Sequence, residues 1–167
     1  LIPQEPLIFN PYRASVPLKS FFTWPREKLC AYFSEDKEPP AAEKAVIVGV
    51  KSCDLAAHRV QDFVFLEGQE VDSLYRLRRE NTVIISSDCT AFKKVCFCLC
   101  LDVLPYPDTG FDLNLSPLNE GYLVEVGSER GEALIKNSQN YFSPAKDTQI
   151  AARSIKRENL IARLKRH

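Results

Sequence analysis

Two short apolar runs decide the fold of this chain: Ala45-Val46-Ile47-Val48-Gly49-Val50 and Thr82-Val83-Ile84-Ile85-Ser86. Neither run alternates polar with apolar residues, which is typical of strands that are covered on both faces. Between them, helices are predicted over Asp54–Asp62 and Asp72–Arg79, and Phe63–Leu66 is predicted to add a short strand. Strand, helix and strand in this order form a βαβ unit, so we expect the two apolar strands to be parallel.

Further elements are predicted on both sides of this unit. After a turn at Tyr106–Gly110, the segments Phe111–Leu115 and Gly121–Val126 alternate in the manner of an antiparallel strand pair. Helices are predicted in three other places: from Arg26 to Phe33, where Cys30 is a small half-buried side chain, from Ala133 to Ser138, and from Asp147 to His167. The predicted fold class is α/β: a small mixed sheet with a parallel βαβ core, an antiparallel addition and flanking helices.

Length and composition narrow the class of protein. The chain has 167 residues, 45% hydrophobic and 26% charged, which is ordinary for a globular protein with a real core. Lys plus Arg (22) balances Asp plus Glu (22), so the basic excess of a nucleic-acid binder is missing. No apolar run is long enough to span a membrane, and we expect a cytoplasmic protein. Because the chain lacks Met, we also expect it to be a piece of a longer polypeptide.

The cysteines carry the functional signal. Cys53 follows the first apolar strand and Cys89 follows the second, and Cys96 and Cys98 come shortly after. In an open parallel sheet, ligands gather beyond the carboxyl ends of the strands. These four thiols would suit an iron–sulfur cluster or a closed zinc site. Since Cys-x2–4-Cys knuckles are missing and the donors are scattered, the spacing favours iron–sulfur.

Several alternatives stay open at this stage. The cysteines could instead form disulfides or remain plain buried thiols. Cys100 could replace Cys96 or Cys98, since all three share one face of an extended chain, or lie buried beside the site. Asp54 and Asp88 could ligate a metal, although capping and turn roles are more usual for aspartate. Cys53 could be a nucleophile at a helix N-terminus.

One histidine and one aromatic residue lie near the cysteines in the sequence. His58 follows Cys53 on the same predicted helix, where an ordinary hydrogen-bonded histidine is expected. Phe97 stands between Cys96 and Cys98, where it would help to exclude water from the centre.

Several segments, in order, resemble a known family. The matching pieces are Pro17–Phe22, Pro25–Glu27, Val48–Leu55, Asp72–Tyr75 with Arg78 and Arg79, Cys89 with Cys96-Phe97-Cys98, Gly110–Leu113 and Gly121–Gly127. Together they are similar to the beta subunit of cytosolic sulfhydrogenases and to its relative among the components of anaerobic sulfite reductase. The likeness runs over most of residues 17–142.

The resemblance implies an electron-transfer subunit of a hydrogenase- or sulfite-reductase-like oxidoreductase. One 4Fe–4S cluster, held by Cys53, Cys89, Cys96 and Cys98, would relay single electrons between a flavin-containing subunit and a catalytic subunit. Residues 1–146 would form the iron–sulfur domain, and 147–167 a helix leading toward a ferredoxin-like module that this chain lacks. The alternative is a docking module for a partner subunit, held by zinc or by bare thiols and without a redox role.

Overall fold

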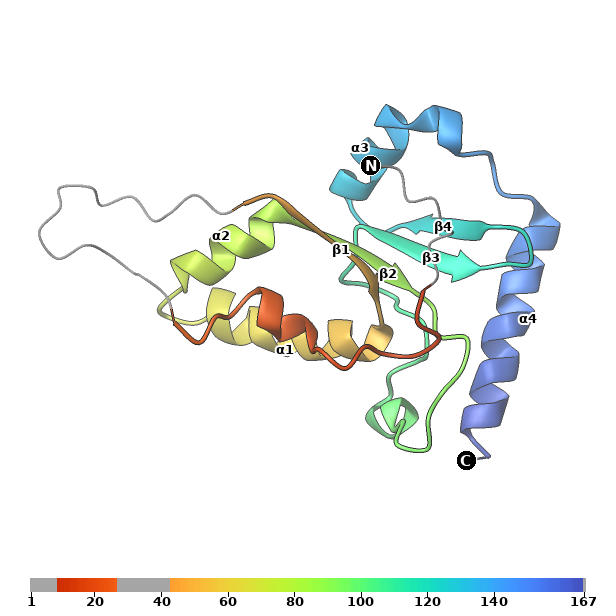
Figure 1. Ribbon diagram of the computed structural model, residues 1–167, viewed down its shortest axis with the longest axis horizontal. Helices are drawn as coiled ribbons and strands as arrows, with labels where there is room; N and C mark the ends of the chain where they lie inside the picture. Colours follow the sequence, from red (N-terminus) through yellow and green to blue (C-terminus); the bar gives the residue numbers. More distant parts are fainter. Residues whose placement is uncertain (1–8, 27–42, 167) are drawn as a thin grey trace, which may run out of the picture.

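The computed structural model describes residues 9–26 and 43–166 of the chain (Figure 1). Its elements, in chain order, are η1 (Leu18–Phe21), β1 (Ala45–Val50), α1 (Ser52–Leu66), α2 (Ser73–Asn81), β2 (Thr82–Ser87), η2 (Cys98–Leu101), β3 (Leu113–Pro117), β4 (Tyr122–Val126), α3 (Glu129–Asn137), η3 (Gln139–Tyr141) and α4 (Asp147–Leu164).

The four strands form one mixed sheet in the order β1-β2-β3-β4. β1 and β2 are parallel, as the βαβ pattern predicts, and β3 is parallel to β2. β4 pairs antiparallel with β3, with Leu115 opposite Val124. The predicted fold class is therefore confirmed, including the antiparallel addition.

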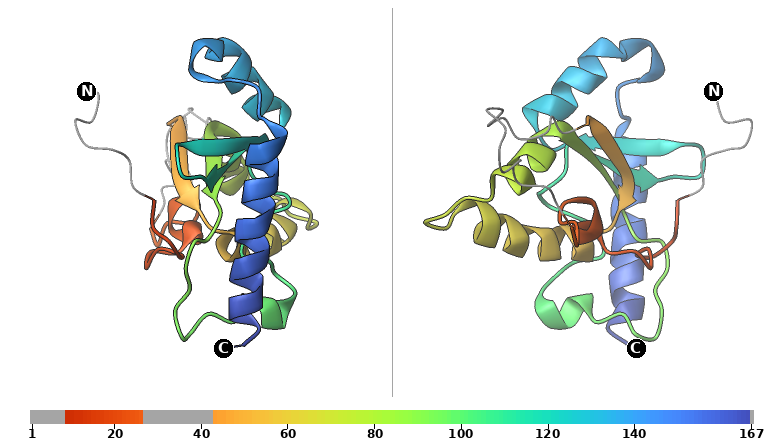
Figure 2. Two further views of the ribbon diagram at one scale, coloured as in Figure 1. Left: turned by 90° about the vertical axis from the view of Figure 1, so that its right-hand side faces the viewer. Right: turned by 60° about the vertical axis from the view of Figure 1, so that its left-hand side comes forward.

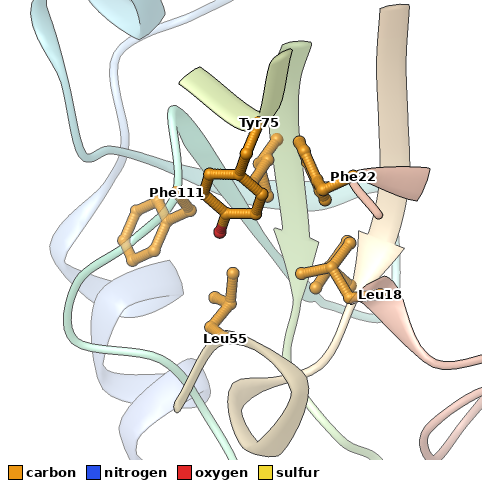
Figure 3. Close-up of a cluster of buried hydrophobic side chains, with 7 residues drawn as sticks. Leu18, Phe22, Leu55, Tyr75 and Phe111 are labelled. Atoms are coloured by element: carbon orange, nitrogen blue, oxygen red, sulfur yellow. The ribbon is translucent and has the colours of Figure 1, made fainter. Parts of the chain in front are cut away.

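Helices α1 and α2 pack on one face of β1 and β2 (Figure 1). The core between them contains Val50 and Ile84 from the strands, with aromatic and aliphatic side chains from both helices and from η1 (Figure 3). Gly49 forms a bulge with a φ of +85°, where the β1–β2 register shifts. Because of this bulge, Ile47 and Val50 both contact the core although they are three residues apart. The bulge thus sets the direction in which the chain leaves β1.

Two features of this layer differ from the prediction. Phe63–Leu66 is the last turn of α1 and not a strand. Phe65 and Leu66 pack against the core while Phe63 and Val64 are exposed, which is a helical pattern of burial. β1 is also not covered on both faces: Val46 and Val48 are 60% and 45% exposed, because α1 and α2 cover only the opposite face.

The remaining elements agree with the prediction in type and differ in their ends. β3 begins at Leu113, because Phe111 is buried in the core and the Asp112 carboxylate accepts a hydrogen bond from the Ile84 N–H at 2.8 Å. α3 begins at Glu129, where Ser128 caps it by accepting a hydrogen bond from the Gly131 N–H. Most of the helix predicted from Arg26 to Phe33, with Cys30, lies outside the described residues.

α4 packs against the β3–β4 hairpin and extends past the end of β2 (Figures 1 and 2). Its Lys156 Nζ donates to the Pro117 carbonyl at 3.3 Å, and Leu160 is buried. The division of the chain at residue 146 stays a prediction. Among the described residues, no helix is both long and apolar enough to cross a membrane.

Candidate metal centre

The carboxyl ends of β1 and β2 bring two of the predicted ligands together. Cys53 is the second residue of α1, directly after β1, and Cys89 follows the end of β2 at Ser87. Since the strands are parallel neighbours, both ends lie at the same edge of the sheet. Burial is the main cause of the raised pKa of Cys89, and the two thiols are close enough for the charge of Cys53 to raise it further.

The loop after β2 supplies the other two thiols. It extends beyond the sheet, beside the last turns of α4, and contains η2 (Figures 1 and 2). Beyond the effect of burial, the charges of Cys98 and Cys96 both raise the pKa of Cys89, and Cys98 also acts on Cys53. Cys89 therefore lies within electrostatic range of Cys53, Cys96 and Cys98, and Cys100 in turn acts on Cys98.

The backbone around Cys89 is fixed on every side by hydrogen bonds. The Asp88 N–H donates to the Leu115 carbonyl at 3.1 Å, and the Cys89 N–H donates to the Pro105 carbonyl at 2.9 Å. The Asp88 carbonyl accepts from Lys51 Nζ at 3.0 Å. These bonds attach the Cys89 peptide to β3, to the far end of the loop and to the start of α1.

The Asp88 carboxylate forms an ion pair with Arg157 of α4. Arg157 donates to it from Nε at 2.7 Å and from Nη2 at 3.1 Å, and Asn114 Nδ2 adds a third bond at 2.9 Å. Arg157 also pairs with Glu125 at 2.5 Å and stacks on the Tyr106 ring, 4.1 Å from its centroid. Asp88 thus has a structural role, because its carboxylate already has three donors.

Cys100 does not share a face with Cys98. The segment from Cys98 to Leu101 is a short 3-10 helix, so the extended geometry expected for this stretch is wrong. Cys100 is exposed, whereas the other four described cysteines are half-buried. Phe97 is 62% exposed, so the prediction that its ring excludes water from the thiols is wrong for this structure.

Burial favours the neutral form of Cys53, Cys89 and Cys98. It raises the pKa of Cys89 to about 12 and also raises the pKa values of Cys53 and Cys98. For Cys98, the N–H groups of Leu99 and of Cys98 itself act in the opposite direction. A nucleophilic cysteine needs a lowered pKa, so the raised pKa of Cys53 counts against the thiol-enzyme alternative.

The spacing of the donors bears on the choice of metal. Among the described residues, no three His, Cys, Asp or Glu side chains are close enough together to hold one metal ion. A zinc ion binds sulfur at about 2.3 Å, so four thiolates around it must nearly touch. A four-iron cluster has a much larger body, so its thiolate ligands lie farther apart than those of a zinc ion.

Two other residues that the sequence singled out have structural partners. Asp54 lies in the first turn of α1 and pairs with Arg13 at 3.1 Å. His58 is buried against Phe22, with ring centroids 4.4 Å apart, and its Nδ1 hydrogen-bonds Gln61 at 3.1 Å. Neither residue is needed to complete the thiol set.

Comparison with known proteins finds a related subunit. The chain is 32% identical over 139 residues to Sulfhydrogenase 2 subunit beta of Pyrococcus furiosus, a match that covers 83% of this chain. The chain is therefore a relative of a sulfhydrogenase beta subunit. It spans 41% of the length of the Pyrococcus protein. No protein-family model matches the chain, and no solved structure matches it.

In this relative of a sulfhydrogenase beta subunit, the sequence did not reveal two residues that contact Asp88 beside Cys89. Lys51 is buried between the ends of β1 and β2, and its place directly after an apolar strand was the available signal. Arg157 is 69 positions from Asp88 in the chain, and no local pattern could have paired them.

Proposed function

We propose that this chain is an iron–sulfur electron-transfer part of a multisubunit, hydrogenase-like oxidoreductase. The proposal is supported mainly by the position of Cys53 and Cys89 at the carboxyl ends of two parallel neighbouring strands, with Cys96 and Cys98 on the loop that follows β2. The kinship with a sulfhydrogenase beta subunit supports the oxidoreductase class.

In this proposal the four thiols hold one 4Fe–4S cluster, which supplies one-electron transfer without bond chemistry. The protein orients the donors through the hydrogen bonds on Asp88 and Cys89. The Lys93 N–H donates to Cys96 Sγ at 3.3 Å, the kind of contact that tunes a cluster through its sulfur ligands. Proposed partners are a flavin-containing subunit and a catalytic subunit, and the cytoplasmic location stays part of the proposal.

The test is a metal and sulfide determination on protein purified without oxygen. We expect about four iron and four sulfide per chain, broad visible absorbance, and an electron paramagnetic resonance signal after reduction. Serine in place of Cys53, Cys89, Cys96 or Cys98 should each lower the iron content. Cys100→Ser is the matched control and should leave the iron content at the wild-type level, since Cys100 is exposed. A colourless protein with stoichiometric zinc would refute the relay.

A second candidate function is favoured by the surface of the loop after β2, which carries Cys96 and Cys98. Val95, Phe97 and Leu101 are all exposed large hydrophobic residues within a few positions of the thiols. Exposed apolar side chains gathered on one loop are typical of a protein–protein contact. In this alternative, zinc or bare thiols hold a loop that docks a partner subunit. The same metal determination separates the two functions.

A further inference from the structure

The ammonium of Lys51 lies buried at the point where the two strands deliver their cysteines. Lys51 is 1% exposed, although lysine is almost never fully buried without a paired charge. It is the N-cap residue of α1, two positions before Cys53. Its Nζ donates at 3.0 Å to the carbonyl of Asp88, which belongs to the peptide bond joining Asp88 to Cys89.

This buried cation has no carboxylate partner among the described residues. The one hydrogen-bond acceptor that the described part of the chain offers Nζ is the Asp88 carbonyl. The nearby Asp88 carboxylate is already bound by Arg157 and Asn114. Burial lowers the pKa of Lys51, and the charges that would act in the opposite direction are those of ionised Cys89, Asp88 and Cys53, in that order of strength. The counter-charge that the site still lacks is the one that thiolates at Cys53 and Cys89 would supply.

We propose that Lys51 is a positioning residue that serves as the counter-charge of the thiolate centre and raises its reduction potential. This inference rests on the proposed function. Reduction adds one electron from a low-potential donor to the centre, and the Lys51 proton stays on Nζ. No bond forms or breaks at Lys51. A cation buried beside a negative centre is poorly screened and stabilises the more negative, reduced state.

The hydrogen bond of Lys51 also has a structural role, which the experiment must distinguish from an effect on the reduction potential. Lys51 also joins the start of α1 to the end of β2 through its bond to Asp88. A purely structural lysine would affect thermal stability and iron content. It would leave unchanged the reduction potential of those protein molecules that still hold a cluster.

The experiment is a redox titration of the anaerobically purified protein, followed by electron paramagnetic resonance. Lys51→Met removes the charge, and Lys51→Gln removes the charge while keeping a donor for the Asp88 carbonyl. In both variants, the ratio of reduced to oxidised cluster at a fixed potential should be about tenfold lower than in the wild type. This corresponds to a fall of about 59 mV in the one-electron reduction potential. Lys94→Met is the matched control, because Lys94 is an exposed lysine two positions before Cys96. Its potential should match the wild type, since solvent screens its charge.

Each remaining outcome decides the inference. Unchanged potentials in both Lys51 variants would overturn it, and so would a shift in Lys51→Met alone, which would assign the effect to the hydrogen bond. If both variants lose the cluster while Lys51→Arg keeps it, the requirement for the charge is supported. If all three lose it, Lys51 is a structural link only. A wild-type protein without iron overturns the proposed function itself, and this inference with it.

Discussion

Removing the Arg157 guanidinium should destabilise the fold. Its side chain is 14% exposed and the Asp88 side chain 7%, so Arg157→Met leaves a buried carboxylate without its main cation. Breaking a buried ion pair from one side costs about 3–5 kcal/mol. Asp88 keeps its bond from Asn114, and Glu125 keeps Arg153 at 2.6 Å, which reduces the cost. We therefore expect a loss of about 2–4 kcal/mol in the free energy of unfolding.

Urea unfolding and thermal melting of the purified protein measure this loss. A change near 3 kcal/mol lowers the Tm of a domain of this size by about 6–12 °C. Lys156→Met is the matched control, because the neighbouring Lys156 makes only exposed hydrogen bonds, to the Pro117 carbonyl at the end of β3 and to Asn119. It should change stability by less than about 0.5 kcal/mol.

A double-mutant cycle with Asp88→Asn separates the pair from general damage to α4. The two changes should not be additive, with a coupling of at least about 1 kcal/mol, because the residues share two hydrogen bonds. Additive losses in the free energy of unfolding would show that Arg157 does not hold the Cys89 segment in place through Asp88. The same would follow if Arg157→Met were as stable as the Lys156→Met control.

Three further predictions test the packing away from the thiols. Burial lowers the pKa of His58, so the contribution of this residue to stability is complete above the unfolded pKa of about 6.5 and falls as the pH drops below it. Between pH 7 and pH 5, the midpoint of urea unfolding should therefore fall less steeply in His58→Gln than in the wild type. Asp72→Ala removes an N-cap that accepts two hydrogen bonds at 3.0 and 2.9 Å, and urea unfolding should show a loss of about 1 kcal/mol, whereas no loss would contradict the capping role. Gly131→Ala places a Cβ into the Asp112 carbonyl and should cost about 1–3 kcal/mol in the same assay, while Gly68→Ala, where the added Cβ makes only ordinary contacts, should not.

The sheet could be predicted because its strands carry their own signal. Ala45–Val50 and Thr82–Ser86 are apolar and rich in β-branched residues, and the helices between them make parallel pairing the expected topology. The strand prediction for Phe63–Leu66 was wrong because a four-residue apolar run does not reveal its period. Only the packed core, where Phe65 and Leu66 are inside and Phe63 is not, identifies it as helical.

The candidate site was predictable to the extent that topology determines it. Cys53 and Cys89 could be paired from the sequence because parallel strands end at one edge of a sheet. The conformation of the segment from Cys98 to Leu101 was not predictable, since three cysteines at alternate positions fit an extended chain as well as a turn. Nor was the Arg157 contact, because it depends on where α4 packs against the hairpin.

The four thiols are positioned by two different parts of the fold, the sheet and the loop after β2. Cys53 lies in the first turn of α1, and Cys89 is fixed through hydrogen bonds to Pro105 and through Asp88. Cys96 and Cys98 lie on a loop whose apolar side chains are exposed. That loop has hydrogen bonds of its own, such as the one that the Val103 N–H donates to the Cys98 carbonyl at 3.0 Å. The proposed cluster would therefore depend both on the pairing of β1 with β2 and on the folding of the loop after β2.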